Sequence, residues 1–228
     1  EGFEKLPARA LVRISGEDAE HFLENLVTCR IEGLAAGEAA FGGLLSPQGK
    51  VLFDFFIVVT GEGYLFDLDQ SLAEEFVKRM RFYKLRAKVE IEPDSGNQCV
   101  LAGWGTRPED AGGIMVADPR RPEMGWRIYG ASTGSNENDA YTAHRIATGM
   151  PAGGEDFEYG DAFPHDCLMD QFGGVDFKKG CYVGQEVVSR MQHRGTAKKR
   201  IVKVGSQEDL PEPGTDITAD GKPAGSLG

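Results

Sequence analysis

Two strand-like segments, residues 39–46 and 51–59, flank the short sequence Pro47-Gln48-Gly49-Lys50, which is a turn signature. A third strand is expected over 64–68, followed by a helix that opens near Ser71 and another strand over 88–92. This order of strand, strand, strand, helix, strand is not the regular alternation of a doubly wound parallel sheet. We therefore expect an α+β fold.

The flanking segments predict further elements of both kinds. A strand over 8–14 leads through Ser15-Gly16-Glu17-Asp18, which resembles a capping box, into a helix with an apolar stripe from Ala19 to Val27. Later strands are expected over 99–104, 115–116, 126–129, 200–204 and 214–218, and helices over 140–148, 164–172 and 186–192. Asp220-Gly221 predicts a hairpin turn near the last residues.

Composition excludes several classes of protein. The net charge of −11 disfavours a protein that coats nucleic acid or binds membrane surfaces, and the best apolar run, 51–59, is interrupted by Asp54. The cysteines are Cys29, Cys99, Cys167 and Cys181; they form no disulfide framework and no zinc-ligand spacing, so no resident metal is expected. Free thiols indicate a reducing compartment, the cytoplasm or, in a eukaryote, the mitochondrial matrix.

The two ends of the sequence suggest that it is incomplete. It opens at Glu1 without a methionine and without the pattern of a signal peptide, and it stops at Gly228, where we expect a new strand to begin. We expect residues beyond both ends. Composition alone predicts no oligomeric state.

The residues around Cys181 form the most reactive segment of the sequence. Lys178 and Lys179 precede this cysteine, and a helix begins near Gly184, so its thiol is a candidate for a lowered pKa. The alternative is a small buried cysteine in a tight turn, with lysines that point to water. A hydrolase nucleophile would also need His165 or His193 within hydrogen-bond reach, and the spacing demands neither.

A run of basic residues follows the same cysteine. Eight cationic side chains or histidines fall between Lys178 and Arg200, within an otherwise acidic chain. Such a local positive patch suits a polyanionic ligand or an RNA backbone. A solvated helix face explains it equally well, because most charge runs are only surface.

The octapeptide Lys179-Gly180-Cys181-Tyr182-Val183-Gly184-Gln185-Glu186 resembles the signature of the YgfZ family, folate-binding proteins related to the glycine-cleavage T-protein (aminomethyltransferase). Residues 45–50 resemble the family's Leu-x-Pro-x-Gly-Lys turn, and Leu85-Arg86-Ala87-Lys88-Val89 its Leu-Arg-x-Lys-Val segment. The motifs extend from about Arg13 to Val204.

This resemblance implies a fold and a division into domains. Relatives of the T-protein form a ring of three domains around a folate-sized opening, with two α+β, ferredoxin-like units and a C-terminal β-barrel. By that resemblance 1–37 and 112–199 form a discontinuous folate-binding domain. Residues 38–111 form the second α+β domain, and 200–228 are part of the barrel.

The resemblance also implies a tetrahydrofolate cofactor and residues that bind it. Arg145 matches an arginine that faces the folate in the T-protein, Asn25 matches a position at the pocket edge, and Asp54 is what remains of a paired Asp-Asp. Cys181 would be the working thiol and Lys179 the residue that tunes it. Tyr182, Gln185 and Glu186 would shape the turn beside the folate.

The function implied is assistance to iron–sulfur cluster assembly or repair in client enzymes, with an indirect link to tRNA modification through one such client. The alternative is a folate-dependent aminomethyltransferase. Two departures count against that chemistry: Phe53-Asp54 retains one carboxylate of the pair, and residues 120–126 lack the T-protein's Gly-Tyr-Thr-Gly-Glu turn. The expected partners are folate and iron–sulfur clients, not a membrane.

Overall fold

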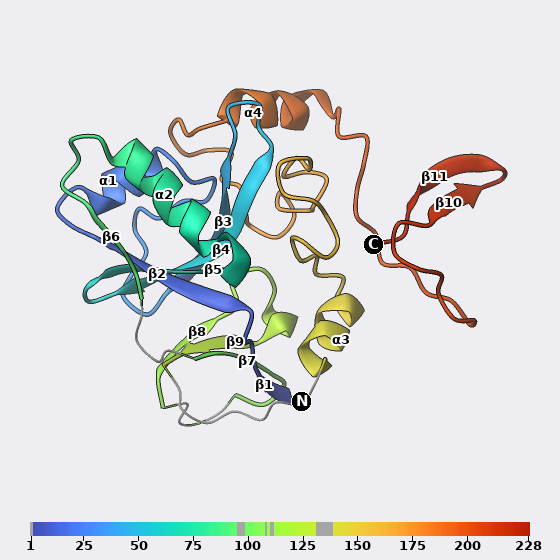
Figure 1. Ribbon diagram of the computed structural model, residues 1–228, viewed down its shortest axis with the longest axis horizontal. Coiled ribbons are helices and arrows are strands. Elements are labelled where there is room, and N and C mark those ends of the chain that lie inside the picture. The colour runs from blue at the N-terminus through green and yellow to red at the C-terminus, as the bar shows by residue number, and fades with distance from the viewer. Residues whose placement is uncertain (1, 95–98, 108, 110–111, 131–138) are drawn as a thin grey trace.

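The computed structural model describes residues 2–94, 99–107, 109, 112–130 and 139–228 (Figure 1). Its larger sheet has five strands in the order β3-β4-β5-β2-β6, and all neighbours are antiparallel. The strands are β2 (Arg9–Ser15), β3 (Ala39–Leu45), β4 (Val51–Thr60), β5 (Gly63–Asp69) and β6 (Glu90–Pro93). Their alternating sequences made these strands predictable.

The helices α1 (Ala19–Glu24) and α2 (Ala73–Lys84) cover one face of this sheet, and the 3₁₀ turn η1 (Gln70–Leu72) precedes α2. Successive residues of β4 point to opposite faces. Phe53, Phe55 and Ile57 pack with Phe22 of α1 and Phe76 of α2 in the largest apolar cluster. Burial of this helical stripe against the sheet fixes the positions of α1 and α2.

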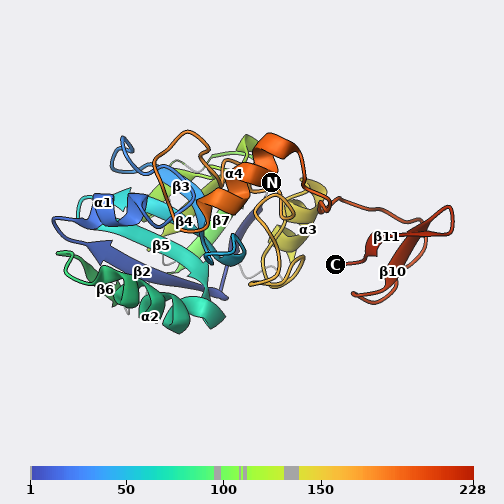
Figure 2. The ribbon, with the colours of Figure 1, turned by 90° about the horizontal axis from the view of Figure 1, so that it is seen from above.

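The opposite face of the five-stranded sheet carries a second apolar cluster. Phe41 and Phe56 from the sheet pack there with Met169, Tyr182 and Val188, which come from the later part of the chain. The segment that contains Cys181 is therefore seated on the sheet face that α1 and α2 leave open. In Figure 2 α2 lies on one side of the sheet and α4 on the other.

A smaller antiparallel sheet has the order β1-β7-β9-β8. Its strands are β1 (Gly2–Lys5), β7 (Val100–Trp104), β8 (Ile114–Ala117) and β9 (Trp126–Tyr129), with the 3₁₀ turn η2 (Pro122–Met124) before β9. The helix α3 (Ala140–Ala147) contacts β1. Figure 1 shows this sheet below the larger one. Its strands β7, β8 and β9 agree with the expected segments, whereas β1 was not predicted.

A buried ionic network joins the two sheets. Asp67 of β5 accepts hydrogen bonds from Arg9 Nε at 2.6 Å, Arg127 Nη1 at 2.8 Å and the Tyr129 hydroxyl at 3.1 Å. Burial alone would raise the pKa of Asp67, but the guanidiniums of Arg9 and Arg127 outweigh it and lower that pKa. The Tyr141 hydroxyl accepts from Arg127 at 3.0 Å, so α3 is bound to the same network.

The remaining elements are α4 (Gln185–Arg194) and the hairpin of β10 (Asp216–Ala219) and β11 (Lys222–Ser226). The hairpin stands away from the rest of the chain in Figures 1 and 2, and its turn is the expected Asp220-Gly221. Among the helices described, none is long and apolar enough to cross a membrane.

Three expectations about local structure were wrong. Residues 164–172 form successive turns rather than a helix, because Leu168 has φ +62° and a left-handed residue interrupts helical bonding. Residues 200–204 form no strand. Ser15 belongs to β2 and caps no helix, while the Asp18 carboxylate accepts from the amide of Lys88 at 2.7 Å.

The sheets group the chain differently from the expected domains. A boundary after residue 37 separates β2 from β3, although both belong to the five-stranded sheet. The strands β1 and β7 likewise pair with each other across about a hundred residues of sequence. The division into three domains stays a prediction. Any such division has to account for these strands, which pair across the expected boundaries.

Candidate functional site

The segment that carries Cys181 is attached to the turn after α1 through Thr28. The buried Thr28 hydroxyl donates to the carbonyl of Gly174 at 2.5 Å and accepts from the amide of Gly43 at 2.8 Å. The amide of Asp176 donates to the carbonyl of Thr28 at 2.9 Å. Sheet, α1 turn and cysteine segment are therefore bound together at one buried point.

Asp176 organises the next turn with its carboxylate. Its oxygens accept from Arg30 Nε at 2.7 Å and from the amides of Lys178 and Lys179 at 2.7 and 3.1 Å. Burial raises the pKa of Asp176, but these hydrogen bonds lower it by more. The ionised carboxylate thus fixes the two residues that precede Gly180 and Cys181.

Lys179 points into the protein. Its side chain is 1% exposed, and Nζ donates to the carbonyls of Val27 at 3.0 Å and Cys29 at 2.6 Å and to Glu24 Oε2 at 2.8 Å. All three hydrogens of the ammonium are used, and within the described residues no hydrogen bond joins it to Cys181. The predicted tuning of the thiol by this lysine stays untested; the geometry gives Lys179 a positioning role.

Cys181 is exposed to solvent. It is followed by the buried Tyr182, whose hydroxyl has no hydrogen-bond partner among the described residues, and by Gly184, which has φ +81° and precedes α4. Gln185 Nε2 donates to the carbonyl of Gly180 at 3.3 Å. A loop fixed on both sides thus presents one thiol to the solvent, as a contact group for another molecule requires.

The other cysteines differ from Cys181 in exposure. Cys29 and Cys167 are buried and Cys99 is half-buried. Burial raises the pKa of Cys29 to about 12 and raises that of Cys167 as well. Only Cys181 combines an exposed sulfur with the anchored loop.

The geometry does not support a cysteine hydrolase. His165 is 1% exposed, and its Nε2 lies 3.0 Å from Gln192 Oε1. His193 is on the last turn of α4, and neither histidine is hydrogen-bonded to Cys181 among the residues described. A nucleophile and base need such a contact.

A bound metal centre would need ligands from elsewhere. No group of three or more histidine, cysteine, aspartate or glutamate side chains in the described part of the chain is arranged to hold a metal ion. A thiolate forms one bond to a metal, so Cys181 alone would leave the other positions of a metal centre to ligands outside the described residues.

Arg145, predicted to bind the folate tail, is 5% exposed on α3. Its guanidinium donates to Asp156 at 2.6 Å, to the carbonyl of Met150 at 3.2 Å and also to Glu155. The first two partners hold it inside the protein, whereas the Glu155 side chain is 60% exposed. Arg145 would have to exchange Glu155 for a ligand carboxylate.

The other predicted folate residues have partners of their own. Asp54 on β4 accepts from the Tyr159 hydroxyl at 2.6 Å, and Asn25 ends α1 with its side chain bonded to the carbonyl of His21 at 2.6 Å. Glu186 pairs with Arg190 on the surface of α4. No hydrogen bond or ion pair among the described residues joins these three to Arg145, so a common folate site stays a prediction.

Sequence reasoning missed the residues that position the loop. Glu24, Thr28 and Asp176 support it through contacts between residues far apart in the sequence. Nothing in the spacing of these three residues predicted their partners.

The basic run after Cys181 is mostly surface. Arg190 pairs with Glu186 and Arg200 pairs with Asp170, whereas Arg194, Lys198 and Lys199 are exposed. These exposed cations on and after α4 leave the interpretations of an anion-binding patch and a solvated face both open.

Comparison with known proteins places this site in a family. A relative named "Iron-sulfur cluster assembly factor IBA57, mitochondrial" from Homo sapiens is 31% identical, over 98% of this chain and 73% of its own length. The chain belongs to the IBA57 family of iron–sulfur cluster assembly factors. An IBA57 homologue from Pyricularia oryzae is 35% identical over 88% of the chain, and the chain spans only 56% of that relative's length.

The C-terminal residues and the fold agree with that assignment. Residues 198–228 match the model of the CAF17 C-terminal beta-barrel domain. The glycine cleavage system aminomethyltransferase T from Bartonella henselae has a similar fold, with a TM-score of 0.66 and 14% identity over 85% of this chain and 63% of its own. The expected T-protein-like α+β fold with part of a C-terminal barrel is confirmed. The expected YgfZ family is close to IBA57 but is not the family shown.

Proposed function

We propose that this protein assists the assembly of iron–sulfur clusters in client proteins and that Cys181 is the thiol that contacts the cluster or the protein that carries it. The observation that carries the proposal is the exposed sulfur on a loop anchored by Thr28, Asp176 and Lys179. The names of the IBA57 relatives support the cluster-assembly role.

The geometry favours a cluster whose ligands come from both this chain and a partner, rather than a cluster held by this chain alone. One thiolate contributes one bond, and the described residues offer no second and third ligand beside it. The cluster is the cargo, and its other ligands come from the partner. The loop holds Cys181 at the surface, where a partner-bound cluster can reach it.

Cys181→Ser tests this role. In a strain that lacks the protein, the variant is expected to fail to restore the activity of cluster-dependent enzymes, although its thermal unfolding stays unchanged. Cys99→Ser is the matched control, because it removes a half-buried thiol that lies just before β7 of the smaller sheet. Full restoration by Cys181→Ser would contradict the proposal.

Tetrahydrofolate binding is a second, separate proposal. Its support is the resemblance of the sequence motifs to folate-binding proteins, while no contact among the described residues joins the predicted residues into one site. Binding would require Arg145 to release Glu155, so Glu155→Gln is expected to raise folate affinity and Arg145→Gln to abolish it. Calorimetric titration with tetrahydrofolate measures both, and no heat from any variant would exclude the proposal.

We also propose a reducing compartment, the mitochondrial matrix in a eukaryote, and an indirect link to tRNA modification. Free thiols fit a reducing compartment, and the relatives' names place those proteins in mitochondria. A link to tRNA modification would arise only through a cluster-dependent client enzyme. Reduced thiolation of tRNA in the Cys181→Ser strain, restored by the wild-type chain, is the expected sign of that link.

A further inference from the structure

Two apolar side chains at the end of α2 are exposed to solvent. Phe82 is 77% exposed and Leu85 is 88% exposed, and their neighbour Tyr83 packs against the main apolar cluster. Leu85 also has φ +46°, a conformation that glycine adopts easily and leucine does not. Leu85 thus exposes a large apolar side chain to solvent, and its backbone conformation is unfavourable for leucine.

An open groove of about 430 Å³ lies beside Leu85. One wall comes from α1 and its ends, and the other is the segment that follows α2. Phe22, Leu26 and Ala87 make part of its lining apolar, whereas Lys84 and Arg86 stand on the second wall. The first wall also carries the polar side chains of Asp18, His21 and Asn25. The groove is therefore partly apolar, with two cations on the side of α2 and one carboxylate on the side of α1.

The two cations on this groove form no ion pair with the part of the chain that the structure describes. Within the described residues no ion pair involves Lys84 or Arg86, although Lys88 pairs with Glu17 nearby. Glu90 and Glu92 line a second hollow beside Lys84 without pairing with it. In a chain of net charge −11, two unpaired cations beside an exposed leucine are a local complement for carboxylates.

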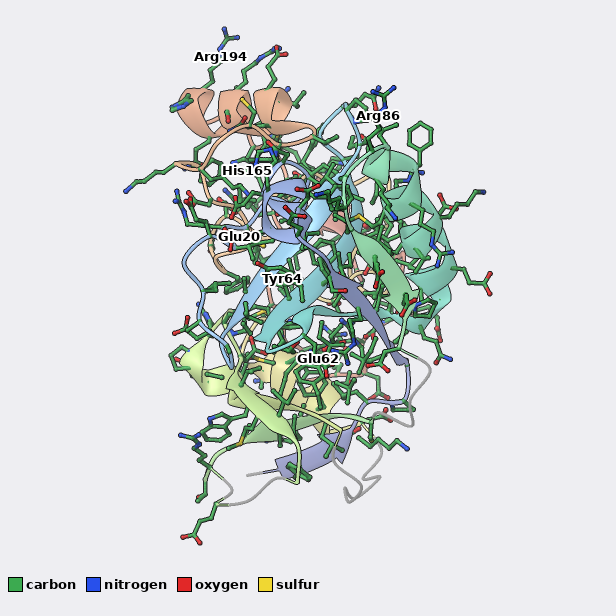
Figure 3. The ribbon with its side chains drawn as sticks, turned by 90° about the vertical axis from the view of Figure 1, so that its left-hand side faces the viewer. Glu20, Glu62, Tyr64, Arg86, His165 and Arg194 are labelled. Atoms are coloured by element: carbon green, nitrogen blue, oxygen red, sulfur yellow. The ribbon has the colours of Figure 1, made fainter. Side chains whose placement is uncertain are left out.

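The groove and the Cys181 loop share one element, the last turn of α1. Glu24 binds Lys179, and the next two residues, Asn25 and Leu26, line the groove. Val183 packs against the same apolar cluster as Tyr83. Figure 3 shows Arg86 at the same end of the molecule as α4 and its residue Arg194.

We propose that the groove between α1 and the end of α2 docks an acidic amphipathic segment of the protein that brings an iron–sulfur cluster to Cys181. The apolar side chains of that segment contact Leu85 and Phe22, and its carboxylates face Lys84 and Arg86. The identity of the partner rests on the proposed function, whereas the docking itself does not depend on Cys181.

The strain at Leu85 gives the proposal a distinctive test. Leu85→Gly removes the exposed side chain and also relieves the unfavourable backbone, so its melting temperature is expected to equal or exceed that of the wild type. The same change is expected to weaken docking. A merely structural Leu85 predicts the reverse, a loss of stability with unchanged binding.

The probe is a synthetic helical peptide of about four turns, with leucine on one face and glutamate on the other. Its binding to the full chain is measured by fluorescence anisotropy. We expect Leu85→Gly and Arg86→Glu each to weaken binding about tenfold or more, as loss of one anchoring side chain does. Ile146→Gly removes another exposed apolar residue, on α3, and is expected to leave binding unchanged.

Parallel binding measurements distinguish this peptide from other molecules that could occupy the groove. Equal binding of a peptide with lysine in place of glutamate, or no binding of either peptide, would overturn the proposal. Self-association that Leu85→Gly abolishes would assign the groove to a second copy of the chain. Arg86-dependent binding to vesicles of anionic phospholipid would assign it to a lipid surface.

The variant Cys181→Ser separates the docking proposal from the thiol proposal. Unchanged peptide binding with no cluster-enzyme activity in this variant supports both proposals. Unchanged peptide binding with full activity would reject only the thiol role.

Discussion

The ammonium of Lys179 lies 2.8 Å from the carboxylate of Glu24, so the loop that presents Cys181 is tied to the last turn of α1 by a nearly buried ion pair. The pair joins residues separated by more than 150 positions in the sequence. Two backbone carbonyls accept the remaining hydrogens of the ammonium. The lysine of the signature octapeptide therefore acts through the position of the loop.

Lys179→Met is expected to destabilise the protein by about 2–4 kcal/mol, because it leaves Glu24 and two carbonyls without their shared donor. Urea unfolding measures the change. Lys178→Met is the matched control, since Lys178 is exposed on the same loop, and its effect should stay within about 0.5 kcal/mol. Equal effects of the two substitutions would remove the positioning role of Lys179.

The pH dependence of stability follows from Glu24 and Asp176. Burial raises the pKa of Glu24, but Lys179 and the amides of Ile31 and Glu32 lower it by more, below its ordinary 4.5. The pKa of Asp176 is likewise held below 3.8. Carboxyls with lowered folded pKa values stabilise fully above their unfolded values, and this stability is lost as the pH falls through the folded ones.

The free energy of unfolding is therefore expected to fall as the pH drops below about 5, and to fall less steeply in Lys179→Met, whose Glu24 has lost the cation that lowers its pKa. Urea unfolding at a series of pH values measures both slopes. Lys178→Met should retain the wild-type slope. Identical slopes in Lys179→Met and wild type would show that the ion pair contributes nothing to acid sensitivity.

Thiol reactivity separates the four cysteines. A colourimetric disulfide reagent is expected to modify Cys181 first and Cys99 more slowly, and to reach Cys29 and Cys167 only after unfolding, because burial denies access and disfavours their thiolates. Cys181→Ser should remove the fast phase and leave the slower ones. A fast phase that survives this substitution would mean that another cysteine is the accessible one.

Local patterns predicted the sheets well because strand formation depends on alternation within a few residues. The observed β9 has the predicted bounds, 126–129, and β4 differs from its expected range by one residue. The segment 164–172 has a helical composition, but a single left-handed residue, Leu168, prevents a helix. Such a conformation is imposed by tertiary packing and is invisible to spacing rules.

The candidate site likewise has features that the sequence predicted and features that it did not. The sequence identified Cys181 and its loop from one short motif but left open whether this cysteine is buried, and in the structure it is exposed. It did not predict that Lys179 turns toward α1 or that Arg145 is enclosed by Glu155 and Asp156, because those contacts depend on how distant segments pack. The unpaired Arg86 beside Leu85 was likewise recognised only as part of a family motif.

The junction between the two sheets is expected to depend on Asp67. Asp67→Ala leaves Arg127 buried without its carboxylate and should cost about 3–5 kcal/mol, the usual effect of breaking a buried ion pair. Glu62→Ala removes a carboxylate that is 78% exposed beside Arg13 and should change stability by less than about 1 kcal/mol. Thermal and urea unfolding compare the two, and similar losses would show that the network contributes no more than a surface pair.

Two glycines of the cysteine loop provide the closest matched pair of variants. Gly184 has φ +81°, and a Cβ there would lie 2.6 Å from the carbonyl oxygen of Ser46, whereas a Cβ on Gly180 would meet no atom within 4 Å. Gly184→Ala should therefore cost about 2 kcal/mol or more, displace the loop and lower cluster-enzyme activity. Gly180→Ala should keep both stability and activity, because the loop geometry is unaffected. Loss of activity in Gly180→Ala without loss of stability would instead show that a partner approaches the backbone at that point.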